Sequence, residues 1–215
     1  MDDSQSYMHP VGREARGPNH ALSLPNLLTY GRVAAVPALV FCFYIENSAS
    51  RWLSLAVFVA ATVSDYLDGY LARAWGQQSA IGRMLDPIAD KLLVATALML
   101  LVSEQTIAGW SLIAAIIILT REISVSGLRE FLAGLNNVRV PVTRLAKYKT
   151  TLQMVAIGFL LVGPAGDRLF RYYFFDVGVV TYIGLLLLWI SALITLYTGY
   201  DYFRAGVRHL MEDGT

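Results

Sequence analysis

Six long apolar stretches, separated by shorter polar segments, dominate the hydropathy pattern of this chain. They cover residues 27–45, 52–75, 87–102, 107–128, 150–162 and 177–199. Most of them approach the ~20 residues that an α-helix needs to cross a bilayer. The third stretch is short, and we expect its helix to begin near Met84, with polar residues facing a cavity. The pattern predicts an all-α membrane protein with six transmembrane helices.

Polar segments flank this apolar region at both ends. Residues 1–22 lack the apolar central stretch of a cleavable signal peptide, so we expect a cytosolic N-terminal arm that lies along the membrane surface, as an interfacial helix would. The six-helix domain should then cover residues 23–204, and residues 205–215 should form a cytosolic C-terminal tail.

Composition and charge support this topology. Hydrophobic residues make up 56% of the chain and charged residues 15%, which is too apolar for an ordinary soluble domain. The net charge of +1 argues against a nucleic-acid partner. With six spans, most Lys and Arg residues fall on the side of the two termini, whereas the other side has only Arg51, Arg168 and Arg171. The positive-inside rule therefore places both termini in the cytosol.

Four aspartates interrupt the second and third apolar stretches. An uncompensated Asp near a bilayer centre costs roughly 3 kcal/mol, so four together would cost on the order of 10 kcal/mol. They belong to the pattern D-x2-D-G-x2-A-R-x8-G-x3-D-x3-D, whose fixed positions are Asp65, Asp68, Gly69, Ala72, Arg73, Gly82, Asp86 and Asp90. Bound cations are the simplest compensation for this charge.

The expected topology brings the two aspartate pairs together at the cytosolic ends of neighbouring helices. The members of each pair are three or four residues apart, so they share a helix face. Oxygen ligands without a nearby His or Cys favour a hard divalent ion, Mg²⁺ first and Mn²⁺ or Ca²⁺ next. Two such ions would balance four carboxylates and can support in-line displacement at a phosphoryl group. The sequence therefore predicts a two-metal site.

An alternative from a different functional class is a cation transporter, because intramembrane carboxylates also mark ion pathways. Such a pathway should have acidic groups along its depth, whereas these four gather at one end of their spans. The clustering favours a site over a pathway.

The aspartate pattern resembles the signature of the CDP-alcohol phosphatidyltransferases at every fixed position from Asp65 to Asp90. The resemblance implies a six-helix homodimer with two Mg²⁺ or Mn²⁺ ions. It implies metal ligation by Asp65, Asp68, Asp86 and Asp90, and it makes Asp90 the general base that deprotonates the acceptor alcohol. It also implies contacts of Asp68, Gly69, Arg73 and Gly82 with the CDP headgroup, and Ala72 leaves room on the same helix face. Asn26 and Thr29 are further candidates for the CDP site, because they form with Arg32 a polar face near the start of the first span; the alternative is a polar face at the membrane interface.

Other segments resemble bacterial members of this family that use glycerol 3-phosphate as the acceptor. The similar segments are residues 23–37, 120–130, 147–154 and 198–203. The resemblance implies transfer of a phosphatidyl group from CDP-diacylglycerol to glycerol 3-phosphate at the inner membrane of a bacterial cell. Two other acceptors stay open: an inositol phosphate, and phosphatidylglycerol in a cardiolipin synthase of this type.

Basic residues on the side of the aspartates are candidate ligands for the acceptor phosphate. An unpaired guanidinium at Arg121, inside an apolar span, would be costly. Glu122 points about 100° away around the helix, so we expect a ligand phosphate to be the partner of Arg121, and Glu122 to support helix packing. The other candidates precede the fifth span, where the positive-inside bias and anionic lipid heads offer an alternative explanation. The full set is Arg121, Arg144, Lys147 and Lys149.

Overall fold

Six helices make up most of the computed structural model, which describes residues 24–45, 47–75, 80–136, 144–173 and 178–212. No strand occurs among these residues, which confirms the all-α class. The predicted N-terminal arm lies outside them, and the predicted C-terminal tail begins inside the last helix. In chain order the helices are α1 (Leu24–Tyr44), α2 (Ser48–Trp75), α3 (Ala80–Ser103), α4 (Ser111–Asn136), α5 (Arg144–Tyr173) and α6 (Val179–Glu212).

Four of these helices, α1, α4, α5 and α6, contain a segment that is long and apolar enough to cross a membrane. The other two, α2 and α3, have 28 and 24 residues and are therefore also long enough. Each of them carries two of the four aspartates of the motif, and these charges lower its apolar character. The chain is thus a multi-pass membrane protein, and the two helices with the candidate site are those that do not qualify as spans by composition.

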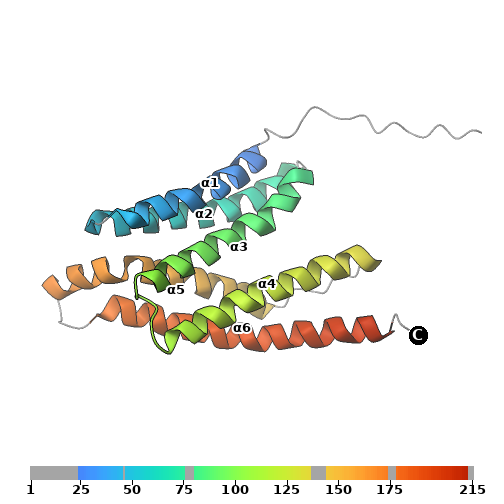
Figure 1. The fold of residues 1–215 in the computed structure, drawn as a ribbon. Coiled ribbons are helices and arrows are strands. Elements are labelled where there is room, and N and C mark those ends of the chain that lie inside the picture. Colours follow the sequence, from blue (N-terminus) through green and yellow to red (C-terminus); the bar gives the residue numbers. More distant parts are fainter. Residues whose placement is uncertain (1–23, 46, 76–79, 137–143, 174–177, 213–215) are drawn as a thin grey trace, which may run out of the picture.

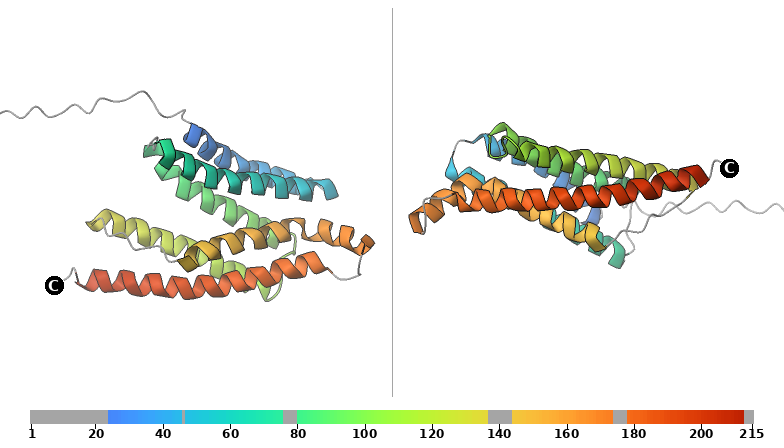
Figure 2. Two further views of the ribbon diagram at one scale, coloured as in Figure 1. Left: turned by 180° about the vertical axis from the view of Figure 1, so that it is seen from behind. Right: turned by 90° about the horizontal axis from the view of Figure 1, so that it is seen from below.

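The helices form two groups, one of α1, α2 and α3 and one of α4, α5 and α6 (Figures 1 and 2). Within the groups, α1 packs against α2 and α3, and α6 packs against α4 and α5, while α2 contacts α5 between them. Successive helices run in opposite directions, so that α2 ends and α3 begins at the same end of the bundle (Figure 1). This topology brings the two aspartate pairs to one end.

Close packing and a helix cap fix α6 against α5. A Cβ added at Gly163 would lie 2.7 Å from Thr181 Oγ1, so only glycine lets the two helices approach this closely. Asp167 accepts a hydrogen bond of 2.8 Å from the backbone N–H of Val180, one of the donors that a helix start leaves unpaired. These contacts hold the start of α6 against α5.

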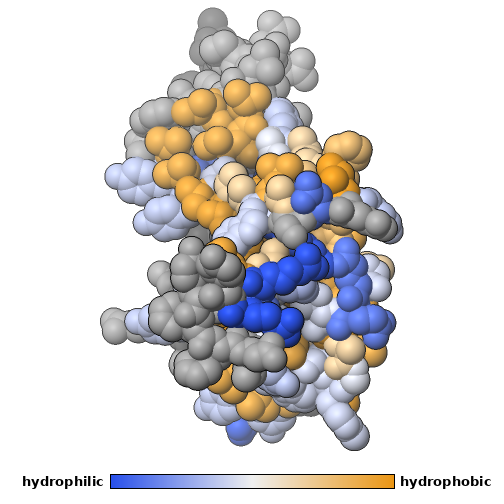
Figure 3. Space-filling model, turned by 90° about the vertical axis from the view of Figure 1, so that its left-hand side faces the viewer, coloured by the Kyte–Doolittle hydropathy of each residue, from blue (hydrophilic) through white to orange (hydrophobic). Residues whose placement is uncertain are grey.

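A small polar cluster occupies the end of the bundle at which α2 begins and α3 ends. Arg51 forms an ion pair with Glu104, and its guanidinium lies 4.3 Å from the ring centre of Phe43. A cavity of about 260 Å³ adjoins the pair. Figure 3 faces this end and shows hydrophilic side chains gathered near the middle, beside hydrophobic ones. Arg168 lines the same cavity and repels Arg51 electrostatically, so this end of the bundle, opposite the aspartates, has two arginines beside Glu104.

Candidate active site

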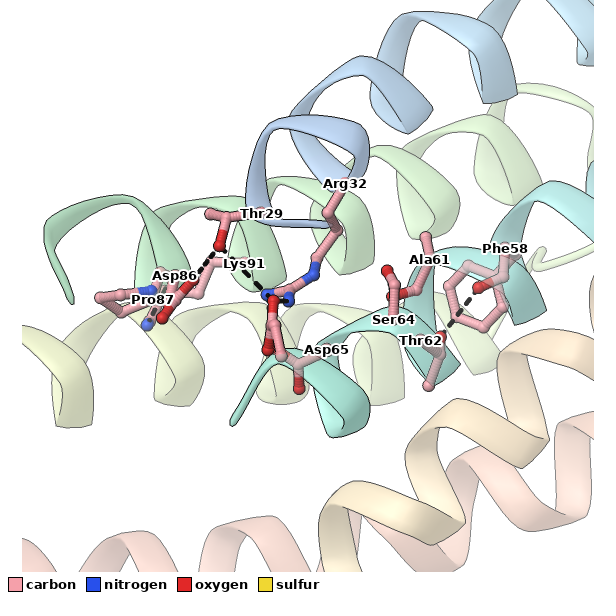
Figure 4. Close-up of polar contacts among 11 residues, drawn as sticks. Thr29, Arg32, Phe58, Ala61, Thr62, Ser64, Asp65, Asp86, Pro87 and Lys91 are labelled. Carbon is pink, nitrogen blue, oxygen red and sulfur yellow. Dashed lines mark hydrogen bonds and ion pairs between the residues drawn. The ribbon is translucent and has the colours of Figure 1, made fainter. Parts of the chain in front are cut away.

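Two side chains of α1 hold three of the four aspartates of the motif (Figure 4). Arg32 forms ion pairs with Asp65 and Asp68 of α2. Thr29 donates a hydrogen bond of 2.7 Å to Asp86 Oδ1 of α3, and the same hydroxyl lies 3.5 Å from Asp68 Oδ2. Residues three apart share a helix face, so α1 presents both side chains to α2 and α3 together. We call Asp65, Asp68, Asp86 and Asp90 the aspartate group.

Burial strengthens the electrostatic interactions among the charges of this group, because less water screens them. Arg32 and Asp68 are almost fully buried, whereas the side chain of Asp65 is 47% exposed. Asp65, Asp68 and Asp86 lie close enough to repel one another electrostatically. One guanidinium thus serves two carboxylates, and Asp86 has a hydroxyl as its partner in place of a cation. The group carries more negative charge than Arg32 can balance.

The donor chemistry of the aspartate group fits a divalent cation. Its ligands are carboxylate oxygens, which suit Mg²⁺ and Mn²⁺. As the side chains stand, no three Asp, Glu, His or Cys residues of the described segments approach closely enough to hold one ion together. In this arrangement the Arg32 guanidinium binds Asp65 and Asp68, and Thr29 holds Asp86. The group therefore has the ligands for a cation, and Arg32 supplies positive charge to two of them.

Asp90 lies one helical turn after Asp86 on α3 and is half-buried. It interacts electrostatically with Asp65, with Glu122 of α4, with its neighbour Lys91 and with Arg32. Asp90 is therefore the member of the aspartate group that faces a second set of charges.

That second set, the Glu122 cluster, consists of Arg121, Glu122 and Lys149. Glu122 Oε1 forms an ion pair with Lys149 of α5 and another, at 3.2 Å, with Arg121 Nη1. Arg121 Nη2 lies 3.5 Å from Thr198 Oγ1 of α6. A Cβ added at Gly199 would lie 3.0 Å from Arg121 Cγ, so glycine there leaves room for the arginine. The cluster joins α4, α5 and α6 and has two cations on one carboxylate.

The expectation that Glu122 does not pair with Arg121 is wrong. The two side chains leave the helix in different directions, but both are long enough to bend toward each other. The buried ammonium of Lys149 holds the Glu122 carboxylate between the two cations. The expected packing role of Glu122 is confirmed by its contact with α5. Arg121 Nε is buried and has no hydrogen-bond partner among the described residues, so the protein satisfies only part of this guanidinium.

The remaining predicted site residues divide into two sets. Asn26, Thr29 and Gly82 are buried at the end with the aspartates, and Gly69 is half-buried beside Asp68. The side chains of the other four residues lie outside the described part of the structure, although their backbone belongs to α2 or α5. These four are Ala72, Arg73, Arg144 and Lys147.

Arg32 is the residue whose place in the site the sequence indicates least clearly. Sequence analysis puts it on a polar face with Asn26 and Thr29 but gives it no partner. The available signal is the three-residue spacing of these positions, which predicts one helix face, combined with the need of a buried arginine for carboxylate partners. The structure supplies those partners from α2.

Comparisons with known proteins agree with the aspartate pattern. The family model for CDP-alcohol phosphatidyltransferase matches residues 22–197. A protein of Rickettsia felis named CDP-diacylglycerol–glycerol-3-phosphate 3-phosphatidyltransferase is 43% identical over 183 residues, which cover 85% of this chain and 94% of the relative. Proteins of the same name from Cereibacter sphaeroides and Shigella flexneri are 38% and 37% identical, and the matches cover 89% and 88% of this chain and 98% of each relative. The chain belongs to the CDP-alcohol phosphatidyltransferase family.

Proposed function

We propose that this protein transfers the phosphatidyl group of CDP-diacylglycerol to glycerol 3-phosphate, which forms phosphatidylglycerophosphate and releases CMP. The names of its relatives support both substrates. The observation that carries the proposal is the position of Asp90, which interacts with the acidic aspartate group and also with Glu122 of the second cluster. A base between a site for a cytidine diphosphate and a site for an anionic acceptor is what this reaction requires.

The aspartate group would receive the diphosphate end of the CDP-lipid. Divalent cations, on which the family generally depends, would be held by Asp65, Asp68, Asp86 and Asp90. When bound, they would neutralise the diphosphate and make its phosphorus more electrophilic. Arg32 orients Asp65 and Asp68 for this task. We assign the CDP contacts to Asp68, Gly69, Ala72, Arg73 and Gly82, with Asn26 and Thr29 on the facing side of α1.

The Glu122 cluster would receive the phosphate of glycerol 3-phosphate. With two cations on one carboxylate it has positive charge to spare, which suits a small dianion. Arg121 offers a buried Nε without a described partner, and Arg144 and Lys147 belong to the first turn of α5, which begins at the end of the bundle with the aspartates. Lys149 is buried and its ammonium is bound to Glu122, so it contributes positive charge to this region from a fixed position.

Asp90 then accepts the proton of the acceptor hydroxyl as its oxygen attacks the β-phosphorus. The new bond joins that oxygen to the phosphatidyl phosphorus, and the bond from this phosphorus to the bridging oxygen breaks. CMP leaves with the electron pair of that bond. No covalent enzyme intermediate is needed.

We also propose that the aspartate end and both termini face the cytosol of a bacterial inner membrane, and that the protein acts as a homodimer. The distribution of Lys and Arg supports this orientation, and the resemblance to the family supports the dimer.

The direct test of the proposal is a competition between acceptors. Purified protein receives CDP-diacylglycerol with equal amounts of glycerol 3-phosphate, inositol phosphate and phosphatidylglycerol, and the lipid products are identified by mass spectrometry. We expect phosphatidylglycerophosphate to predominate, and a different main product would refute the proposed acceptor. Tracer flux into liposomes without CDP-lipid tests the transporter alternative, for which we expect no flux.

A further inference from the structure

A groove of about 650 Å³ runs along the bundle between α2 and α5. Asp65 lines one end of it, and Trp52 lies on the same helix toward the other end. The thirteen residue steps from Trp52 to Asp65 correspond to about 20 Å of helix. The middle of the groove has apolar walls that include Phe58, Val59 and Val155. The groove thus begins at the aspartate group and continues over an apolar surface.

The length and the position of this groove fit an acyl chain. One leaflet makes up half of the ~30 Å hydrocarbon core of a bilayer, about 15 Å, so the groove is long enough to cover the depth of a leaflet. Asp65, with its half-exposed side chain, belongs both to the groove and to the ion pair with Arg32. A lipid whose diphosphate lies at the aspartates would therefore have its glycerol at the mouth of the groove and a chain within reach of it.

A second apolar groove, of about 970 Å³, lies between α4 and α6 but has a different relation to the site. Arg121, Tyr197 and Tyr200 line it, and none of the four aspartates does. A chain in that groove would lead away from the Glu122 cluster and not from the aspartate group. The groove between α2 and α5 is therefore the one that continues from the phosphorus that reacts.

We propose that the groove between α2 and α5 takes one acyl chain of CDP-diacylglycerol, and that Val155 and Gly158 set the length of chain that it accepts. This inference rests on the proposed function, because it assumes the CDP-lipid as substrate. Thr150 lies near the start of α5 and lines the groove, and Gly158 lies eight residues later, about 12 Å farther along the helix. A Cβ at Gly158 would meet only Leu55 Cδ1, at 3.4 Å, so a larger side chain would project into the groove.

The selection would be steric. Surrounding lipid is as apolar as the groove, so burial of a chain gains little hydrophobic free energy there. A bulky side chain part-way along the groove would instead exclude the distal part of a long chain and leave room for a short one. Chain-length preference is therefore the property that reports whether the groove is used.

The test uses two CDP-lipids, one dioctanoyl and one dioleoyl, in mixed micelles with saturating glycerol 3-phosphate. In Val155→Trp and Gly158→Phe, the ratio of kcat/KM for the short lipid to that for the long lipid should rise about tenfold or more. The matched control is Leu186→Trp, at a 61% exposed position of α6 that lines neither groove. Its ratio should equal that of the wild type.

Val155→Trp is the deciding variant, because Val155 is already 43% exposed and the indole need not enter the core. An unchanged ratio in this variant overturns the inference, and so does an equal rise in Leu186→Trp. A wild type that makes no phosphatidylglycerophosphate from either lipid would refute the proposed function. A wild type that uses both lipids, with variants whose ratio is unchanged, would refute only the role of the groove.

Discussion

The aspartate group and the Glu122 cluster are both buried arrangements of Arg or Lys with carboxylates, and they have opposite imbalances. In the first, Arg32 serves Asp65 and Asp68 while Asp86 is held by a hydroxyl. In the second, Arg121 and Lys149 share the single carboxylate of Glu122. One region is short of positive charge and the other is short of negative charge, so the first suits cations and the second suits an anion.

The Arg51–Glu104 pair at the opposite end of the bundle has a more exposed carboxylate than either of these regions has at its buried centre. Its arginine side chain is 13% exposed and its glutamate side chain 37% exposed, and Arg168 lines the same cavity and repels Arg51 electrostatically. An imbalance of charge that is maintained under burial is costly, and the protein has two such imbalances at one end, with Asp90 interacting across both. The aspartate motif distinguishes this end of the bundle from the other, and we infer that its two imbalances serve ligands.

Removal of divalent cations should have the largest effect, because it leaves the aspartate group without its missing positive charge. We expect EDTA to reduce CMP release to background, and Mg²⁺ or Mn²⁺ to restore it. The measurement is CMP release from CDP-diacylglycerol with glycerol 3-phosphate present. Full turnover in metal-stripped protein would contradict the cation-binding role of the group.

Asp90→Asn should have the next largest effect, a loss of roughly 10²- to 10⁴-fold in kcat, because an amide cannot accept the hydroxyl proton. Binding of the CDP-lipid, measured by displacement of labelled CDP-diacylglycerol, should persist. Asp167→Asn is the matched control, since Asp167 caps α6 far from the site. Normal turnover in Asp90→Asn would place the base elsewhere.

Substitution of the shared carboxylate of the Glu122 cluster should affect stability more than chemistry. Glu122→Gln leaves two buried cations without their shared carboxylate, and we expect a loss of about 3 kcal/mol in the free energy of unfolding. Adding Lys149→Met should recover part of that loss, because one unpaired cation is then removed. Denaturation of the single and double variants in detergent measures both quantities. Additive losses would show that the two side chains are not coupled.

Arg51→Met should have the smallest effect. Glu104 is 37% exposed, so water can solvate its carboxylate once the arginine is removed, and loss of the pair should cost no more than about 1 kcal/mol. The contact with Phe43 adds about 0.5 to 1 kcal/mol. Neither kcat nor either KM should change. A change in KM for glycerol 3-phosphate would mean that this end of the bundle also takes part in function.

Much of the fold follows from the apolar stretches, and the differences have a physical cause. Hydropathy reports contact with lipid, so it predicts residues 150–162 for a helix that in fact spans Arg144–Tyr173 and continues with polar residues at both ends. Likewise, α6 extends to Glu212, well beyond the apolar stretch that ends at residue 199. The four aspartates are predictable because three- and four-residue spacings fix a helix face.

The partners of Arg32 and the pairing of Glu122 with Lys149 are not predictable in this way. Arg32 meets Asp68 across 36 residues of sequence, and Lys149 meets Glu122 across 27. Such contacts depend on which helices pack together, and periodicity within one sequence gives the face of a helix but not its neighbour. The structure supplies that information, and with it the opposite charge imbalances of the two regions.

The most direct test of the two-region account is steady-state kinetics with both substrates varied, on Arg121→Ala and Asp68→Asn. A charge-assisted contact is worth about 1.5 to 3 kcal/mol, so Arg121→Ala should raise KM for glycerol 3-phosphate roughly 10- to 150-fold and leave KM for CDP-diacylglycerol nearly unchanged. Asp68→Asn should show the reverse asymmetry. Equal damage to both KM values in both variants, or wild-type use of free glycerol as readily as glycerol 3-phosphate, would contradict the division into a cation-binding and a phosphate-binding region.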